Sequence, residues 1–277
     1  MKDNKDHIIS GTTKLFGCIA HPTDHVRAPS IFNPVFAAKG QDAVMVPIDI
    51  HPDMIEEGIA GLRAMPNFIG AAVTIPHKMP IASLCDKLSD VAKITGAVNA
   101  IRFQDGKLYG ENFDGAGFVA GLYGEGHNLD GKKCLMIGAG GAARAIAYAL
   151  CGEPIAQLDV YNRTTQKADE LVEAVLSETP DAKIPNAKIN VAQVLNEADY
   201  DVVINATSLG LQSTDSLPCD PQKLSETALV CDIIMAPEQT PLLVAASARG
   251  LVCHFGRHML DYQKSLISAF IGADDVA

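Results

Sequence analysis

Hydrophobic and polar positions along the chain follow two alternating periods. Strand-length apolar runs alternate with patterns of helical spacing throughout the first part of the sequence. Such alternation is typical of parallel strands joined by right-handed crossover helices. The predicted strands are 14–19, 43–48 and 68–73, and the predicted helices are 28–39, 54–65 and 81–92.

Two shorter strand-like runs, 97–103 and 107–109, lie on either side of Asp105-Gly106. An Asp-Gly pair in this position indicates a tight hairpin turn. A helical pattern then covers 114–122, and a polar, glycine-rich segment, 123–131, leads into the next apolar strand.

The remainder of the chain repeats the alternation. Further strands are predicted at 157–161, 201–204, 229–234 and 251–254, and the last helix at 259–271. The sequence therefore predicts a two-domain α/β protein with its boundary near Asn112 to Asp114. Because ligands of such sheets bind at the carboxyl ends of the strands, we expect a two-substrate site in the cleft between the domains.

The stretch from Cys134 to Ala143 combines an apolar strand, a glycine turn and an alanine-rich helix pattern. Gly138 permits the tight turn, Gly140 lets the backbone approach a phosphate, and the small Ala143 lets the helix lie close to the sheet. The helix N-terminus faces the anion. This pattern predicts a site for the pyrophosphate of a dinucleotide, whereas the glycines alone would fit any tight turn.

The following strand decides which dinucleotide is expected. Sites for NAD usually end this strand with an acid that binds the ribose 2′-hydroxyl, but here it ends in Asn162-Arg163. A guanidinium suits a 2′-phosphate, which favours NADP. Asp159 has nearly the usual spacing, but it falls inside the predicted strand. Thr164 either caps the next helix or also contacts the phosphate.

The composition of the chain excludes several classes of protein. The 277 residues carry a formal net charge of −11, which argues against a general nucleic-acid or anionic-membrane binder. No apolar run is long enough to span a membrane, and the polar start of the chain does not resemble a signal peptide. Seven cysteines without a Cys-x-x-Cys pair indicate reduced thiols in a cytoplasmic protein. The eight histidines show no metal-ligand spacing, so no metal is expected.

A second polar constellation follows the strand that ends at Val73. Lys78, in Thr74-Ile75-Pro76-His77-Lys78, lies where a ligand of the sheet would bind, and Asp114 lies at the domain boundary. A lysine whose pKa is lowered by desolvation can take the hydroxyl proton as hydride leaves an alcohol, while a carboxylate orients it. The simpler alternative is a solvated lysine and an aspartate that caps a helix.

Taken together, the motifs resemble those of the shikimate dehydrogenase family, including its quinate/shikimate branch. The resemblance covers almost the whole chain. The stretches that carry it, in the order of the family, are 73–78, 96–99, 110–115, 138–143, 162–164, 205–210 and 256–263.

The resemblance implies a substrate-binding catalytic domain over 1–113, an NADP-binding Rossmann domain over 114–255, and a final helix, 256–277, that returns to the first domain. It implies that Lys78 and Asp114 form the catalytic pair, in an activity of aromatic amino acid biosynthesis. Thr74, Asn99 and Gln263 would then contact the substrate. The residues expected to bind the cofactor are Gly138, Ala139, Gly140, Gly141, Ala142, Asn162, Arg163, Thr164, Thr207 and Gly256.

The chain departs from the family where the substrate carboxylate and hydroxyls are bound. The family has a Ser-x-Ser-Pro motif after its first strand, and here Val26 and Ala28 occupy the serine positions if Pro29 is the family proline. Arg27, between them, either binds a carboxylate or points to solvent. Three further positions are changed from the family's Asn, Thr and Tyr, and they are Ala72, Phe113 and Met235.

These changes remove polar groups while the predicted hydride-transfer residues are kept. We therefore expect an NADP-dependent dehydrogenase with poor activity on shikimate and a different, less polar alcohol as substrate. The alternative is a non-catalytic protein that binds NADP as a sensor, but a sensor has no need of the Lys78 and Asp114 pair. The family resemblance leaves a monomer and a homodimer equally open.

Overall fold

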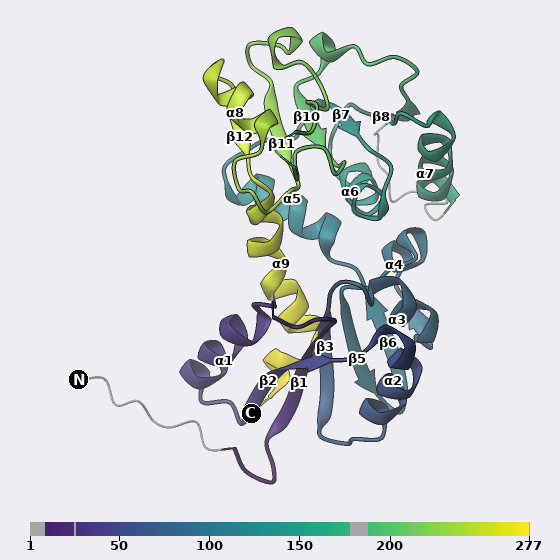
Figure 1. Cartoon of the computed structure of the whole chain (residues 1–277), viewed down its shortest axis with the longest axis vertical. Helices are drawn as coiled ribbons and strands as arrows, with labels where there is room; N and C mark the ends of the chain where they lie inside the picture. Colours follow the sequence, from purple (N-terminus) through teal and green to yellow (C-terminus); the bar gives the residue numbers. More distant parts are fainter. Residues whose placement is uncertain (1–8, 25, 178–187, 213, 277) are drawn as a thin grey trace, which may run out of the picture. The chain divides into compact units, whose positions relative to one another are not determined.

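The computed structural model describes residues 9–24, 26–177, 188–212 and 214–276. The chain divides into two compact units (Figure 1). The first unit comprises the residues up to Asn112 together with those from Ser265 onward, and the second comprises Phe113–Lys264.

The first unit contains a mixed six-stranded sheet in the order β2-β1-β3-β5-β6-β4. Strands β1, β2 and β3 are parallel, whereas β5 is antiparallel to both β3 and β6. The strands are β1 (Lys14–Ala20), β2 (Ala43–Asp49), β3 (Phe68–Val73), β4 (Lys87–Leu88), β5 (Ala100–Gln104) and β6 (Lys107–Glu111).

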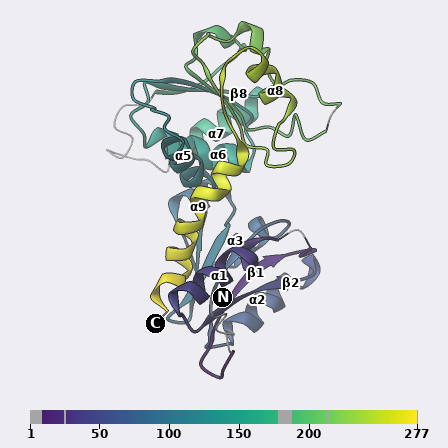
Figure 2. The same ribbon diagram turned by 90° about the vertical axis from the view of Figure 1, so that its left-hand side faces the viewer.

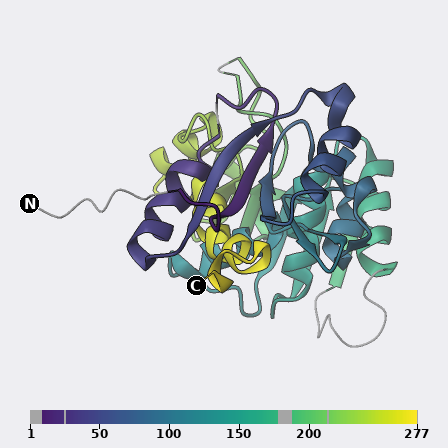
Figure 3. The ribbon, with the colours of Figure 1, turned by 90° about the horizontal axis from the view of Figure 1, so that it is seen from below.

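Helices cover both faces of this sheet (Figure 3). Phe16 of β1 packs against Phe36 of α1, with ring centroids 5.5 Å apart. Ile19 of the same strand points to the opposite face, into a core shared with Ile59 of α2 and Ile81 of α3. The helices are α1 (Ala28–Lys39), α2 (Ile55–Arg63), α3 (Lys78–Leu84) and α4 (Asp90–Thr95), with the short helix η1 (Pro52–Met54) before α2.

The helix predicted over 81–92 is wrong. The structure has α3, the short strand β4 and α4 in this region. Asp86 binds Leu108 twice, through its backbone N–H and through its carboxylate, and Ser89 caps α4 by accepting from the N–H of Ala92. These contacts give the backbone of 85–89 better partners than a continuous helix would. The predicted hairpin is confirmed, since Asp105 and Gly106 have φ values of 51° and 73°.

The second unit contains a parallel six-stranded sheet in the order β12-β11-β10-β7-β8-β9. This is the doubly wound order of the Rossmann fold, with the break in strand order between β7 and β10. The strands are β7 (Lys133–Ile137), β8 (Gln157–Tyr161), β9 (Lys188–Val191), β10 (Val202–Asn205), β11 (Leu229–Asp232) and β12 (Val252–His254).

Helices α5, α6 and α7 lie together in this unit, and α8 packs on the β11–β12 side of the sheet (Figure 2). Gly115 of α5 allows close packing, because a Cβ there would lie 2.0 Å from the carbonyl oxygen of Ala145 on α6. The helices are α5 (Asp114–Gly124), α6 (Gly141–Cys151), α7 (Thr165–Ser177), α8 (Pro241–Ala248) and α9 (Gly256–Ile271), with short helices η2 (Glu197–Asp199), η3 (Pro221–Lys223) and, near the end of the chain, η4 (Ala273–Asp275).

Two elements of this unit, β9 and α8, are absent from the sequence-based prediction. Helix α9 is divided between the units at Lys264, whereas the sequence assigns the whole of 256–277 to the first domain.

Candidate active site

The turn between β7 and α6 has the backbone that the glycine pattern requires. Gly138 has a φ of 119°, and a Cβ at this position would lie 2.7 Å from the carbonyl oxygen of Ala206. Its N–H donates to the carbonyl oxygen of Tyr161 at 2.8 Å, which joins the turn to the end of β8. Gly138 is therefore required both for its dihedral angle and for lack of space.

The same turn has room for an anion above the start of α6. A Cβ placed on Gly140 or on Gly141 meets no atom within 4 Å, so open space lies next to the first N–H groups of the helix. Ala143, in the first turn of α6, is completely buried. An open glycine backbone at the N-terminus of a buried helix fits the pyrophosphate of a dinucleotide, and Ala139 and Ala142 lie in the same turn.

The end of β8 carries the residues that the sequence assigns to the 2′-phosphate. Asn162 donates through Nδ2 to the carbonyl oxygen of Thr164 at 2.8 Å, which shapes the turn into α7. The same carbonyl oxygen accepts from the N–H of Lys167 at 3.0 Å, so Thr164 is the residue that precedes the helix. Arg163 and Lys167 are both exposed. Lys167 is thus a second cation at this helix start, beside Arg163.

The carboxylate of Asp159 accepts hydrogen bonds from residues of the sheet and its surroundings. It accepts from Tyr200 Oη at 2.7 Å, from Gln157 Nε2 at 2.7 Å and from Asn190 Nδ2 at 3.0 Å. With three donors and an exposed fraction of 8%, this acid stabilises the neighbouring strands. It is not placed at the tip of β8, where an acid would bind a ribose 2′-hydroxyl.

The loop after β10 is organised by two buried side chains. Asp232, at the end of β11, accepts from Asn205 Nδ2 at 3.0 Å and from Thr240 Oγ1 at 2.7 Å. Asn205 in turn accepts from the hydroxyl of Thr207 at 2.7 Å, and that hydroxyl also accepts from the N–H of Leu209. The hydroxyl of Thr207 is thus used within the loop, and its role toward a cofactor stays a prediction.

In the first unit, the structure brings Thr74, Lys78 and Asn99 together through the backbone. The N–H of Thr74 donates to Ile19 at the end of β1 at 3.0 Å. The carbonyl oxygen of Lys78 accepts from Val98 at 2.9 Å, and the carbonyl oxygen of Asn99 accepts from Val73 at 2.8 Å. The three residues therefore lie at one edge of the sheet, where β1 and β3 end. Asn99 is buried, and Lys78 and Thr74 are half-buried.

The segment that leads to Asp114 is held by a half-buried acid, Glu111. Its carboxylate accepts from Ser89 Oγ and, at 2.7 Å, from the N–H of Asn112. Burial raises the pKa of Glu111 above its ordinary value, although both hydrogen bonds lower it. Asn112 donates through Nδ2 to the carbonyl oxygen of Ala97 at 3.1 Å. Asp114 is the first residue of α5 and is 7% exposed.

Gln263 and Gly256 lie on α9, in the part that belongs to the second unit. A Cβ on Gly117 of α5 would lie 2.7 Å from the Cβ of Gln263, so this glycine lets the two helices approach closely. A Cβ on Gly256 would lie 2.4 Å from the carbonyl oxygen of Ile234. Gly256 thus serves close packing beside the loop after β11.

Val26 and Ala28, which the sequence predicts to occupy the serine positions of the family, lie at the start of α1. Arg27 precedes the helix, has no side-chain capping bond and is exposed, and Ala28 is the first helical residue. Val26 donates its N–H to the carbonyl oxygen of Thr23. Neither the Val26 nor the Ala28 side chain can donate a hydrogen bond. The other changed residues lie on β3 (Ala72), directly before α5 (Phe113) and, 46% exposed, after β11 (Met235).

A cluster of three histidines in the second unit was not predicted. His254, at the end of β12, is completely buried, and its Nδ1 lies 3.3 Å from Nδ1 of His258 on α9. The rings of His127 and Phe118 lie 5.4 Å and 5.7 Å from the His254 ring. The Nε2 atom of His254 has no hydrogen-bond partner among the described residues. His258 Nε2 lies 3.9 Å from Glu125.

This cluster predicts a loss of stability in mild acid. Burial, followed by the neighbouring His258 and His127, lowers the pKa of His254 to about 3. The unfolded chain, with a histidine pKa of about 6.5, binds the proton first. Stability is therefore complete above pH ~6.5 and is lost as the pH falls toward 3. We expect His254 to contribute about 2 kcal/mol to the fall in the free energy of unfolding between pH 7 and pH 5.

Urea unfolding at the two pH values measures this effect. The His254→Phe variant should lack this part of the fall, whereas the exposed His51→Phe should keep it. An equal pH dependence in wild type and His254→Phe would contradict the assignment.

Among the described residues, no group of three or more His, Cys, Asp or Glu side chains is placed to hold a metal ion. None of the described helices has both the length and the apolar character needed to cross a membrane.

The fold and site define a class of protein: a two-domain α/β protein with a Rossmann unit whose glycine turn has room for a dinucleotide. Comparison with known proteins narrows this class. Residues 18–101 match the model of the shikimate dehydrogenase substrate binding domain, and residues 123–233 match that of shikimate / quinate 5-dehydrogenase. The shikimate dehydrogenase (NADP(+)) of Rubrobacter xylanophilus is 38% identical over 261 residues, which cover 92% of this chain and 89% of that protein.

Solved structures of similar fold include two shikimate dehydrogenases. Shikimate 5-dehydrogenase from Listeria monocytogenes, in complex with shikimate and NAD, has a TM-score of 0.83 at 30% identity and covers 96% of this chain and 93% of its own. A shikimate dehydrogenase in complex with NADP+ has a TM-score of 0.82 at 32% identity, with coverages of 96% and 92%. The 5-ketofructose reductase of a Gluconobacter strain has a TM-score of 0.78 at 28% identity, with coverages of 92% and 91%.

The chain belongs to the shikimate dehydrogenase family. The resemblance drawn from the sequence, the two-domain α/β fold and the dehydrogenase class are thereby confirmed.

Proposed function

We propose that this protein transfers hydride reversibly between NADP and a secondary alcohol of a cyclic hydroxy acid or a related alcohol. NADP as cofactor is borne out by the relatives, which carry NADP(+) in their names, and by a solved structure that contains NADP+. The open glycine turn at Gly140 and Gly141 and the exposed Arg163 fit this cofactor.

When bound, NADP+ would accept the hydride that leaves the alcohol carbon. In the direction of oxidation, the amine of Lys78 takes the proton of the substrate hydroxyl and becomes an ammonium. In the direction of reduction, the ammonium returns this proton to the carbonyl oxygen. Asp114 orients the lysine, Asn99 and Gln263 bind substrate hydroxyls, and Thr74 lines the same pocket. This division of roles follows the family pattern, residue by residue.

The observation that carries the proposal is the backbone network around Lys78. Three hydrogen bonds fix Thr74, Lys78 and Asn99 at the carboxyl edge of one sheet. That is the edge at which sheets of this type bind ligands, and a structural lysine has no need of such a position. The network therefore supports a catalytic role for Lys78.

The substrate pocket supports a change of specificity. Val26 and Ala28 stand at the start of α1 in place of serines, so two hydrogen bonds to a substrate carboxylate are lost. We propose that shikimate is a poor substrate. One neighbour of similar fold is named a 5-ketofructose reductase, and 5-ketofructose carries no carboxylate. This neighbour supports an uncharged hydroxylated substrate.

Initial rates of NADPH formation with shikimate, quinate and an uncharged cyclic polyol test the proposal. We expect the highest kcat/KM for a substrate without a carboxylate. Efficient turnover of shikimate, with a KM typical of a biosynthetic enzyme, would contradict the proposed change of specificity. NADP binding without turnover of any alcohol would favour the sensor.

The cofactor preference depends on Arg163. The Arg163→Asp variant should move the ratio of kcat/KM from NADP toward NAD by at least about tenfold, because a 2′-phosphate contact is replaced by an acceptor for the ribose hydroxyl. Kinetics with both cofactors measure the ratio. Lys188→Asp, at the amino end of β9, makes the same change of charge away from the site and should leave the ratio unchanged. An unchanged ratio in Arg163→Asp would exclude Arg163 from this contact.

A further inference from the structure

The backbone of the turn from Thr74 to Lys78 is hydrogen-bonded to two neighbouring segments, the end of β1 and the residues before β5. Thr74 donates to Ile19 at the end of β1, Ile75 accepts from His21 at 3.3 Å, and Lys78 accepts from Val98. These contacts join backbone atoms, so a substitution that changes only the side chain leaves them in place.

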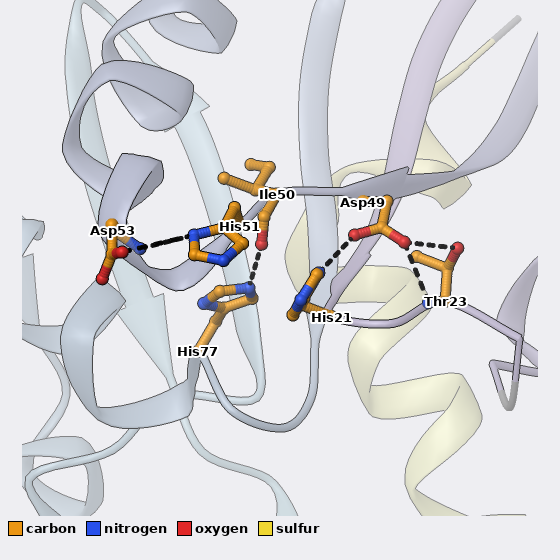
Figure 4. A network of polar contacts seen from close by, with 7 residues as sticks. All are labelled: His21, Thr23, Asp49, Ile50, His51, Asp53 and His77. Carbon is orange, nitrogen blue, oxygen red and sulfur yellow. Dashed lines mark hydrogen bonds and ion pairs between the residues drawn. The ribbon is translucent and has the colours of Figure 1, made fainter.

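A further contact of this turn is made by a side chain. His77 Nε2 lies 2.8 Å from the carbonyl oxygen of Ile50, in the segment that follows β2 (Figure 4). A carbonyl oxygen only accepts, so Nε2 carries the hydrogen and donates. The His77 side chain is completely buried. Its Nδ1 has no hydrogen-bond partner among the described residues.

His77 also sets the start of α3. It is the residue before the helix, its carbonyl oxygen accepts from the N–H of Ile81 at 3.0 Å, and Lys78 is the first helical residue. The direction in which the Lys78 side chain leaves the backbone therefore depends on the position of a residue that is held at both ends, by its ring and by its carbonyl group.

The segment after β2 is itself held in place. Asp49 accepts from His21 Nδ1 at 2.8 Å and from the N–H of Thr23 at 3.2 Å, so it joins the ends of β1 and β2 (Figure 4). The N–H of Ile50 donates to Ala20 at 3.2 Å. The carbonyl oxygen of Ile50 is thus a fixed acceptor rather than part of a free loop.

We propose that His77 is a positioning residue for Lys78: its hydrogen bond to Ile50 fixes the turn from which the general base reaches the substrate. This inference rests on the proposed role of Lys78. Proton transfer requires the base within hydrogen-bond reach of the hydroxyl, and a displacement of about 1 Å can cost about a hundredfold in rate. A residue that served stability alone would not affect kcat selectively.

The test compares His77→Phe with His77→Gln. Phenylalanine fills a similar volume but cannot donate, whereas the glutamine amide presents an N–H at nearly the same distance from the backbone. We expect His77→Phe to lower kcat by about tenfold to a hundredfold while the KM of the alcohol and of NADP changes by less than about threefold. His77→Gln should restore kcat to within about threefold of wild type.

His51→Phe is the matched control, because His51 lies in the same segment, is exposed and contacts Asp53 (Figure 4). It should behave as wild type. If His77→Phe does not fold, His77→Asn replaces it, since its amide is one methylene too short to reach Ile50 and should lower kcat in the same way.

Wild-type kcat in His77→Phe, or equal losses in the phenylalanine and glutamine variants, would overturn the inference. Lys78→Ala in the same assay separates this failure from a failure of the proposed function. An active Lys78→Ala variant would show that Lys78 is not the general base, and the proposed function would fail. An inactive Lys78→Ala beside a fully active His77→Phe would refute the positioning role alone.

Discussion

Replacing Lys78 with alanine should lower kcat for alcohol oxidation by about a thousandfold, because the hydroxyl proton loses its acceptor at the moment hydride leaves. The binding of NADP should be unchanged, since the residues predicted to bind it lie in the other compact unit. Steady-state rates of NADPH formation measure the loss, and a titration of NADPH fluorescence measures the binding.

Lys93→Ala provides the control for this loss. Lys93 is an exposed lysine of the same unit that forms an ion pair with Asp90 at 3.0 Å. Its removal should change kcat by less than about twofold, because exposed ion pairs contribute at most about 1 kcal/mol to stability. If Lys78→Ala were as active as Lys93→Ala, Lys78 would have no part in the chemistry.

Restoring the two serines should give the protein activity on shikimate. The double variant Val26→Ser/Ala28→Ser returns two hydroxyl donors to the start of α1, where the family binds the substrate carboxylate. Each hydrogen bond to a charged group is worth about 1.5 kcal/mol or more. We therefore expect kcat/KM for shikimate to rise about a hundredfold, with most of the gain in KM.

The same two replacements further along α1 provide the control. Val35→Ser/Ala37→Ser changes exposed residues of this helix and should leave shikimate kinetics unchanged. An uncharged cyclic alcohol should gain nothing from Val26→Ser/Ala28→Ser. A gain of equal size for charged and uncharged alcohols would show that the serines do not act through the carboxylate.

The sequence predicts those parts of the fold in which one period persists or a turn has its own signal. The parallel strands β1 and β3 contain continuous apolar runs, and Asp105-Gly106 marks the hairpin. It does not predict α8, because Pro241–Ala248 is apolar on every side and shows no helical face. It also misses β4, which is only two residues long.

The residues of the candidate site also fall into those that the sequence predicts and those that it does not. Lys78 could be found because it lies in the turn that follows a buried strand, and Gly138 because a positive φ and a crowded Cβ leave only glycine. The contact of His77 with Ile50 and that of His127 with His254 join residues far apart in the sequence. No local pattern encodes such pairs, since they arise only when the sheet is assembled. Asp159 is the opposite case, in which a local pattern is misleading. Its spacing in the sequence resembles that of a ribose-binding acid, but its carboxylate accepts hydrogen bonds from Tyr200 and Asn190 within the sheet.

A double-mutant cycle on Lys78→Ala and Asp114→Asn, read as kcat for alcohol oxidation by NADP+, tests the central claim most directly. If the ammonium and the carboxylate act as one proton-transfer unit, the double variant should be no slower than the slower single variant, because either change alone already disables the pair. Losses that multiply, or a single variant with wild-type kcat, would contradict the account.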